Sequence, residues 1–365
     1  MFGGLLDRVR GKAVTIPPLD GPLRANTAID DAPALCEATA PDDLAFDGTS
    51  FLFSSGDTVQ ALPADGTGAP VPVARFDVAV TALAGAADGS VAVALDDGRI
   101  MIRGGARDGL ALAPSDVGGL ACPTALAFAG DGALLVCQGA AGRRPSDWVV
   151  DLMEKGASGS VWRIDLAAGR AARLAGDLAF PYGVLADAPG GGIVVAESWR
   201  HRLVRVPANG GAPVPVLARL PGYPARLTPA ADGGAWLCLF APRNRLIEFV
   251  LQEDAYRADM MRDVARPYWI APALSSGSSF LEPLQCGGVK TMGIHKPWSP
   301  SRSYGLLVRL DRNLRPVASF HSRADGNVHG VTSIAEQGGI LFVGAKGSGA
   351  IIALEAADSP GGADR

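Results

Sequence analysis

The strongest constraint on the fold is a hairpin phrase that recurs along the chain: an apolar run, a glycine-containing turn and a second apolar run. The turn glycines are Gly48, Gly89, Gly132, Gly191, Gly233 and Gly338. Such turns between apolar segments favour tight β-hairpins, because tight hairpin turns need positive φ. Three of the spacings between these glycines are 41, 43 and 42 residues. A period of about 40–50 residues is typical of a propeller blade, so the sequence predicts an all-β, six-bladed β-propeller.

The two longer spacings, 59 and 105 residues, predict insertions into this ring at about 140–158 and 246–303. We expect a short helix in the first, and a helical stretch that ends before Pro267 in the second. The Ser-, Gly- and Pro-rich remainder of the second predicts a long lid loop over the propeller. The sequence further predicts an N-terminal extension at 1–35, the propeller itself at 36–358 and a disordered tail at 359–365.

Composition narrows the class of protein. With 48% hydrophobic residues the chain can offset the entropy of ordering, so it is expected to be globular. A net charge of −4 without long runs of one sign argues against a nucleic-acid partner. We expect no signal peptide and no membrane span, because charge interrupts the first apolar stretch and no later stretch is long enough. Five dispersed cysteines fit a reduced, cytoplasmic protein, although an exported protein without disulfides would look the same. The oligomeric state is left open.

Several phrases resemble those of strictosidine-synthase-like proteins. They are Phe180–Val206, Leu220–Asn244, Tyr304–Asp311 and Val328–Ser333. The resemblance covers roughly residues 40–355. It implies a six-bladed propeller related to the SMP-30/gluconolactonase and paraoxonase/arylesterase groups, acting on a small organic molecule at its central channel.

The residue just before each hairpin phrase is expected to face the channel axis. These residues are Asp42, Thr81, Thr124, Tyr182, Ala225 and His329, and Asp43 and Arg226 follow directly after two of them. Convergent polar groups at a channel mouth indicate a binding site for a small molecule.

The related lactonases and paraoxonases hold calcium at this position, and the resemblance matches Asp42 to their carboxylate ligand. Two further ligand positions carry Tyr182 and Ala225, and the nearby Arg226 would repel a divalent cation. We therefore expect no cofactor, with calcium as the alternative. The catalytic glutamate of the plant condensing enzyme falls on Thr332, which argues against amine–aldehyde condensation.

Our sharpest hypothesis is that the charge of Arg226 replaces the missing cation and neutralises Asp42 and Asp43. His329 would then act as general base on a water, and Tyr182 would donate to a substrate carbonyl. The remaining candidates for substrate contact are Thr81, Thr124, His295 and Trp298, the last two in the lid loop.

This arrangement predicts hydrolysis of an ester or lactone. The competing interpretation is a structural ion pair and a histidine that is only hydrogen-bonded. The alternatives are therefore a non-catalytic propeller that binds a ligand or a protein, and an amine–aldehyde condensing enzyme.

Overall fold

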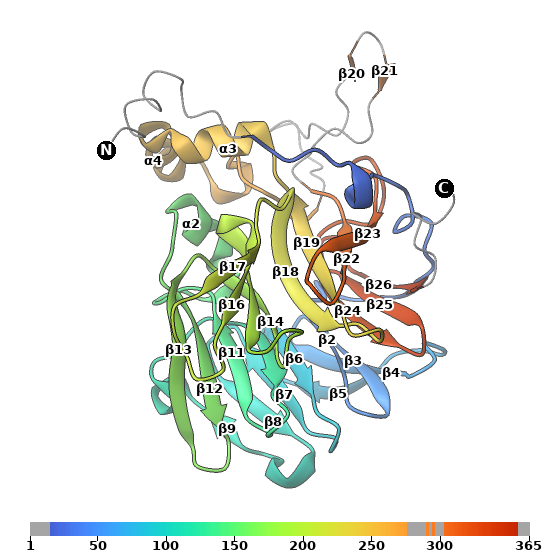
Figure 1. The fold of residues 1–365 in the computed structure, drawn as a ribbon, viewed down its shortest axis with the longest axis vertical. Helices are drawn as coiled ribbons and strands as arrows, with labels where there is room; N and C mark the ends of the chain where they lie inside the picture. The colour runs from blue at the N-terminus through green and yellow to red at the C-terminus, as the bar shows by residue number, and fades with distance from the viewer. Residues whose placement is uncertain (1–14, 276–289, 292–293, 296–302, 357–365) are drawn as a thin grey trace.

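The computed structural model describes residues 15–275, 290–291, 294–295 and 303–356, and it confirms the predicted six-bladed propeller. Its blades are six four-stranded antiparallel sheets (Figure 1). The first three sheets are β2 (Leu44–Phe46), β3 (Ser50–Ser55), β4 (Thr58–Pro63) and β5 (Val71–Arg75); β6 (Val80–Gly85), β7 (Val91–Leu95), β8 (Ile100–Arg103) and β9 (Ala111–Leu112); and β10 (Pro123–Phe128), β11 (Leu134–Gln138), β12 (Gly159–Asp165) and β13 (Arg170–Leu178).

The last three sheets complete the ring, and the sixth takes its outer strand from the start of the chain. They are β14 (Pro181–Leu185), β15 (Ile193–Glu197), β16 (Arg202–Val206) and β17 (Val214–Leu217); β18 (Gly222–Pro229), β19 (Ala235–Pro242), β22 (Leu306–Leu310) and β23 (Pro316–His321); and β24 (Val331–Gln337), β25 (Ile340–Ala345), β26 (Ala350–Glu355) and β1 (Ala34–Glu37).

The hairpin turns adopt the backbone that the sequence predicts. All six turn glycines have positive φ, from 59° at Gly338 to 95° at Gly48. The second strand of several blades is buried along its whole length, as in β7 and β11, because neighbouring sheets cover both of its faces. Among the described residues the apolar core divides into six clusters, one at each junction between neighbouring blades. Each blade therefore buries its apolar faces against its two neighbours.

Strand β1 closes the ring. It pairs antiparallel with β26, with Cys36 opposite Ile351, and it begins at Ala34, inside the predicted N-terminal extension. At the same seam the rings of Phe51 and Phe342 stack with centroids 3.7 Å apart, which joins the first blade to the sixth.

The helical insertions are confirmed and lie at the same end of the propeller (Figure 1). The α-helices are α2 (Trp148–Met153), α3 (Arg245–Gln252) and α4 (Asp254–Asp263), and the 3-10 helices are η1 (Gly21–Leu23), η2 (Gly105–Arg107), η3 (Pro114–Val117), η4 (Pro145–Asp147), η5 (Ser198–Arg200) and η6 (Arg266–Tyr268). Within the predicted lid loop, β20 (Lys290–Thr291) pairs with β21 (Ile294–His295). None of the described helices is long and apolar enough to cross a membrane.

Buried hydroxyl groups link neighbouring blades around the axis. Thr81 donates a hydrogen bond to the carbonyl of Pro123 at 3.0 Å, and Thr332 donates to the carbonyl of Asp42 at 2.9 Å. Thr124 and Ser198 donate in the same way to the carbonyls of Pro181 and Pro224. These bonds fix the inner strands relative to one another, and with them the residues at the channel mouth.

Replacing Thr332 with valine should therefore weaken the junction between the sixth and first blades. We expect Thr332→Val to lower the free energy of unfolding by about 1 kcal/mol, the net value of one buried hydrogen bond. Thr332→Ser keeps the hydroxyl and is the matched control. Denaturant unfolding of the three proteins is the measurement, and equal stability of the valine variant and wild type would contradict this account.

Candidate functional site

The guanidinium of Arg226 occupies the channel axis. Its Nη1 donates to the carbonyl and to Oδ1 of Asp42, at 2.8 and 2.9 Å, and its Nη2 donates to the carbonyls of Thr81 and Thr124. Its Nε lies 2.8 Å from Oδ2 of Asp43. Its two Nη nitrogens thus make four hydrogen bonds inside the protein, whereas Nε forms an ion pair with Asp43 without hydrogen-bond geometry.

A local irregularity in β18 positions Arg226. The register between β18 and β19 shifts between Pro224 and Leu227, which places Ala225 and Arg226 in a bulge. Bulges re-aim side chains out of the regular alternation of a strand. Here the bulge accompanies a guanidinium aimed across the channel to the first three blades, 5% exposed.

The two neighbouring aspartates are held by backbone and hydroxyl groups at the start of the first blade. The Ser54 hydroxyl accepts hydrogen bonds from the amides of Asp42 and Asp43, at 2.8 and 3.1 Å. The Asp43 carboxylate accepts from the amides of Leu44 and Leu83, at 2.9 and 2.8 Å, so it also ties the first blade to the second. Both side chains are buried and have little freedom to move.

The carboxylate of Asp42 stays ionised because of its cations. Burial alone would raise the pKa of Asp42, but the ammonium of Lys346 and the guanidinium of Arg226 outweigh burial and lower it. Lys346 pairs with Oδ2, and the Tyr182 hydroxyl donates to Oδ1 at 2.9 Å. Burial and then the charge of Asp42 raise the pKa of Tyr182 well above its usual value, so the phenol remains a donor.

Asp43 titrates in the opposite direction. Burial raises the pKa of Asp43 to about 6, although Arg226 opposes this shift. The difference from Asp42 arises because Asp42 has Lys346 as a second cation, whereas Asp43 has Arg226 and backbone amides.

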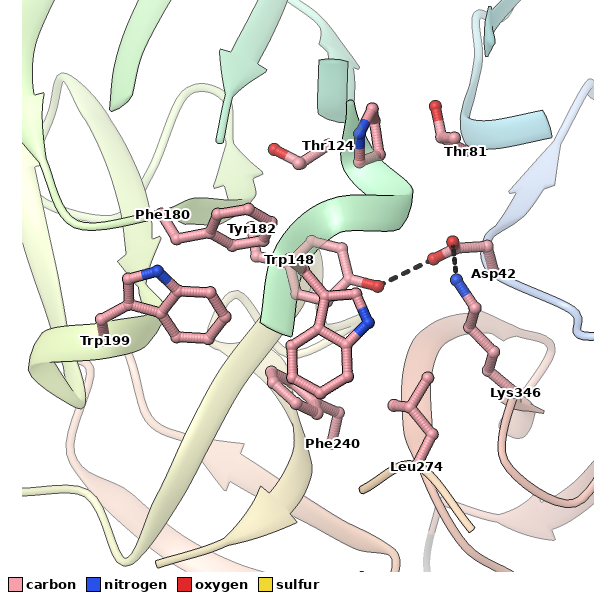
Figure 2. Close-up of a pocket in the computed structure, with 11 residues that line it drawn as sticks. Asp42, Thr81, Thr124, Trp148, Phe180, Tyr182, Trp199, Phe240, Leu274 and Lys346 are labelled. Atoms are coloured by element: carbon pink, nitrogen blue, oxygen red, sulfur yellow. Dashed lines mark hydrogen bonds and ion pairs between the residues drawn. The ribbon is translucent and has the colours of Figure 1, made fainter. Parts of the chain in front are cut away.

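An enclosed space, which we call the upper cavity, lies at the channel mouth beside these groups. Its volume is about 20 Å³, room for about one water molecule. It is lined by Asp42, Thr81, Thr124, Pro145, Trp148, Phe180, Tyr182, Trp199, Phe240, Leu274 and Lys346. Figure 2 shows Asp42 and Lys346 on one side and the aromatic rings gathered on the other.

The aromatic side of the upper cavity is packed ring on ring. Phe180 stacks on Trp199 with centroids 4.4 Å apart, and Trp148 meets Phe240 edge to face at 5.5 Å. The indole of Trp199 also donates to Asp151 of α2 at 2.8 Å, which holds α2 over the blade below it. The cavity therefore has a fixed apolar wall and a helix as part of its cover.

Leu274 completes the cover from the side of Lys346. Its carbonyl oxygen lies against Gly347, where a Cβ atom would be only 1.6 Å from it. Only glycine permits this approach, which places the second insertion directly on the β25–β26 hairpin that carries Lys346. A ligand larger than a water must displace part of this cover.

A second space, which we call the lower chamber, lies on the other side of Arg226 and has a volume of about 400 Å³. Asp43 and Arg226 line it together with apolar residues of the inner strands, such as Ala84, Leu126 and Val184. Because Arg226 also bonds to three residues that line the upper cavity, its side chain separates the two spaces.

The structure brings together most of the predicted site residues. Asp42, Thr81, Thr124 and Tyr182 line the upper cavity, and Arg226 and Asp43 meet them at the axis. His329 is buried elsewhere, with Nδ1 3.1 Å from the Ser303 hydroxyl and Nε2 2.9 Å from the Gly326 carbonyl.

Two predicted site residues in the lid loop cannot be compared with the structure. Trp298 lies outside the described residues, and of His295 only the backbone pairing in β21 is described.

Sequence reasoning missed Lys346 and the aromatic wall. The prediction used only the residues before the first strand of each hairpin. In an antiparallel hairpin the end of the second strand lies beside the start of the first, as in the pairing of Val331 with Ala345. Lining up the residues after the second strands would have identified Lys346.

The axial oxygens fit a guanidinium and not calcium. The carbonyls of Asp42, Thr81 and Thr124 and both aspartates already accept from Arg226, whose positive charge occupies the position that a divalent cation would need. Within the described part of the chain, no group of three or more His, Cys, Asp or Glu side chains is arranged to hold a metal ion.

Comparisons with known proteins agree on the fold. No family model and no curated protein matches the sequence. Among solved structures, a gluconolactonase from Xanthomonas campestris matches with a TM-score of 0.55 at 14% identity, over 88% of both chains. Regucalcin from Agrobacterium tumefaciens, described as calcium-binding, gives 0.53 at 16% identity over 88% of this chain and 92% of its own. A luciferin-regenerating enzyme gives 0.52 at 11% identity over 91% and 95%. These similarities establish a shared propeller fold.

Removing the axial guanidinium should strongly destabilise the propeller. We expect Arg226→Met to lower the free energy of unfolding by about 3–5 kcal/mol, because it leaves two buried carboxylates without their shared cation. Arg75→Met is the matched control, since Arg75 pairs with Asp57 at 3.1 Å with 78% of its side chain exposed. This exposed pair should contribute less than about 1 kcal/mol. Equal losses in the two variants, measured by denaturant unfolding, would contradict a central role for Arg226.

The raised pKa of Asp43 predicts a pH dependence of stability. The folded protein holds a proton on Asp43 up to about pH 6, whereas the unfolded chain releases it near the ordinary value of 3.8. Stability from this group is therefore lost as the pH rises between these values. We expect the stability of wild type relative to Asp43→Asn to fall over this range in unfolding measurements. A difference that grows with pH would show that Asp43 is ionised throughout.

Proposed function

We propose that the protein hydrolyses an ester or lactone at the upper cavity. The observation that carries this proposal is an ionised carboxylate with two hydrogen-bond donors beside a space for one water. Asp42 supplies the carboxylate, and Tyr182 and Lys346 supply the donors. This is a set suited to activating a water and stabilising negative charge on an oxygen.

The chemical step uses these groups in turn. Asp42 accepts a proton from the water as its oxygen attacks the carbonyl carbon of the substrate. Lys346 donates one of its remaining N–H groups to the oxygen on which negative charge develops, and Tyr182 turns its hydroxyl from Asp42 to the same oxygen. The proton then passes from Asp42 to the departing alkoxide, so the carboxylate is regenerated and water is the only reagent consumed. Arg226 touches no reacting atom and acts as a positioning residue that holds Asp42.

Substrate entry requires displacement of the cover. An ester or lactone cannot fit beside Asp42 within about 20 Å³, so Trp148 of α2 or the segment at Leu274 must move. The aromatic wall behind them favours substrates with apolar or flat groups next to the carbonyl.

The likeness in fold supports this reaction class. A gluconolactonase and a luciferin-regenerating enzyme share the propeller, and the resemblance of phrases such as Phe180–Val206 to strictosidine-synthase-like proteins points to related enzymes. At these identities the likeness supports the site's place in the fold, and the chemistry is argued from the side chains. Calcium has no role in the proposal.

A non-catalytic binding propeller is the second candidate. It is favoured by the buried ion pairs of Arg226 with Asp42 and Asp43, which are also what a purely structural charge cluster requires. In that case the same cavity would bind a small molecule without turnover.

Turnover on a panel of aryl and alkyl esters and lactones tests the proposal. We expect wild type to hydrolyse members of the panel, and Asp42→Asn and Lys346→Met each to lose at least about 100-fold in kcat, through loss of the base or of a charged donor. Lys155→Met is the matched control, because Lys155 also pairs with an aspartate, Asp254, but at the surface.

His329→Ala decides between the two candidate bases. Loss of turnover in Asp42→Asn alone assigns the base to Asp42, whereas loss in His329→Ala alone assigns it to His329. No turnover by wild type on any member of the panel would leave the binding propeller in place of the hydrolase.

A further inference from the structure

We infer that Lys346 is also a carbonyl-capturing amine, which forms a protonated imine with a small aldehyde that enters the upper cavity. This inference goes beyond the proposed hydrolysis, because imine formation needs no ester turnover. It rests on the position of the Lys346 ammonium, its partner Asp42 and the apolar wall that faces them.

The position of Lys346 combines access with enclosure. Its side chain is 23% exposed, and it lies at the end of β25 with Leu274 packed against the next residue. Rings of Trp148, Tyr182 and Phe240 line the same cavity (Figure 2). The ammonium thus faces a space with room for about one water, which a small aldehyde enters when part of the cover is displaced.

The surroundings of Lys346 suit a nucleophile in one respect. Lysine nucleophiles in enzymes are found in apolar pockets. Lys346 lines such a pocket, and the carboxylate that holds it also pairs with Arg226. Asp42 therefore divides its negative charge between two cations. An arginine at this position could not take the role, since a guanidinium does not lose its proton in proteins.

The reaction balances without any external oxidant or reductant. The Lys346 ammonium passes a proton to Asp42, and the nitrogen lone pair attacks the aldehyde carbon. Asp42 returns this proton to the new alkoxide, which gives a carbinolamine that is protonated on nitrogen. Asp42 then carries a proton from this nitrogen to the carbinolamine hydroxyl, to which Tyr182 donates a hydrogen bond. The C–O bond then breaks, water departs and the nitrogen lone pair forms the C=N bond. The sum is ammonium plus aldehyde giving iminium plus water.

Charge conservation makes the product compatible with the site. The iminium keeps the single positive charge of the ammonium, so it keeps the ion pair with Asp42. The aromatic rings opposite can stabilise this more diffuse cation through their faces. A surface lysine gains neither effect, and water surrounds it and reverses imine formation.

Reductive trapping with acetaldehyde is the test. The full-length protein is incubated with acetaldehyde and cyanoborohydride, which reduces an imine to a stable ethylamine, and the modified sites are mapped by peptide mass spectrometry. The chain contains five lysines, Lys12, Lys155, Lys290, Lys296 and Lys346, so each is readily mapped. We expect Lys346 to be ethylated at least about tenfold faster than Lys155, which is ion-paired to Asp254 but 45% exposed.

Two variants separate chemistry from folding. Lys346→Arg keeps the positive charge for Asp42 and should abolish trapping at this position while leaving Lys155 labelling unchanged. Asp42→Asn should slow trapping at Lys346, because it removes the proton acceptor and the partner of the iminium. A thermal melt of each variant verifies that it is folded.

The inference is overturned if Lys346 is labelled no faster than Lys155 in folded wild type, or if Asp42→Asn labels as fast as wild type. Ester and lactone turnover measured on the unlabelled protein reports separately on the proposed hydrolysis. Trapping without turnover would support imine formation by Lys346 and contradict the proposed hydrolysis. Turnover without trapping would support the hydrolysis and contradict imine formation.

Discussion

The contact between the Arg226 guanidinium and the first three blades is the interaction on which the site depends. This planar cation comes from the fifth blade, and its position is fixed because its nitrogens contact two carboxylates and three backbone carbonyls. A closed ring of sheets leaves inward-facing carbonyl groups at its axis, and these need donors when water is excluded. Arg226 supplies the donors and the charge together. It therefore links the stability of the ring to the orientation of Asp42.

Two consecutive aspartates at this centre acquire different properties from their neighbours. Asp42 faces the upper cavity with Lys346 and Tyr182, and the surrounding cations lower its pKa. Asp43 faces the lower chamber, where burial raises its pKa to about 6. These adjacent residues thus have different roles. Asp42 is the reactive carboxylate in our proposal, and Asp43 links the first two blades.

The sequence was sufficient for the architecture because the turn glycines and their spacing reflect the geometry of each blade. It was also sufficient for the axial cluster, since the position before each hairpin identified Asp42 and Tyr182, and the residues just after identified Asp43 and Arg226. It failed for Lys346, which follows the second strand β25, and for Phe240, which lies within the second strand β19, because the prediction did not align the second strands. The aromatic wall could not be predicted either, because Trp148 comes from an insertion whose docking depends on contacts such as Trp199 with Asp151.

The guanidinium of Arg226 also blocks the central channel between the upper cavity and the lower chamber. A molecule that reaches Asp42 cannot pass through to the opposite face, because Arg226 stands between the upper cavity and the lower chamber. As far as the described residues line the upper cavity, entry and exit both pass the cover formed by α2 and Leu274. The rate at which this cover opens consequently limits how often a molecule that enters beneath it can be exchanged.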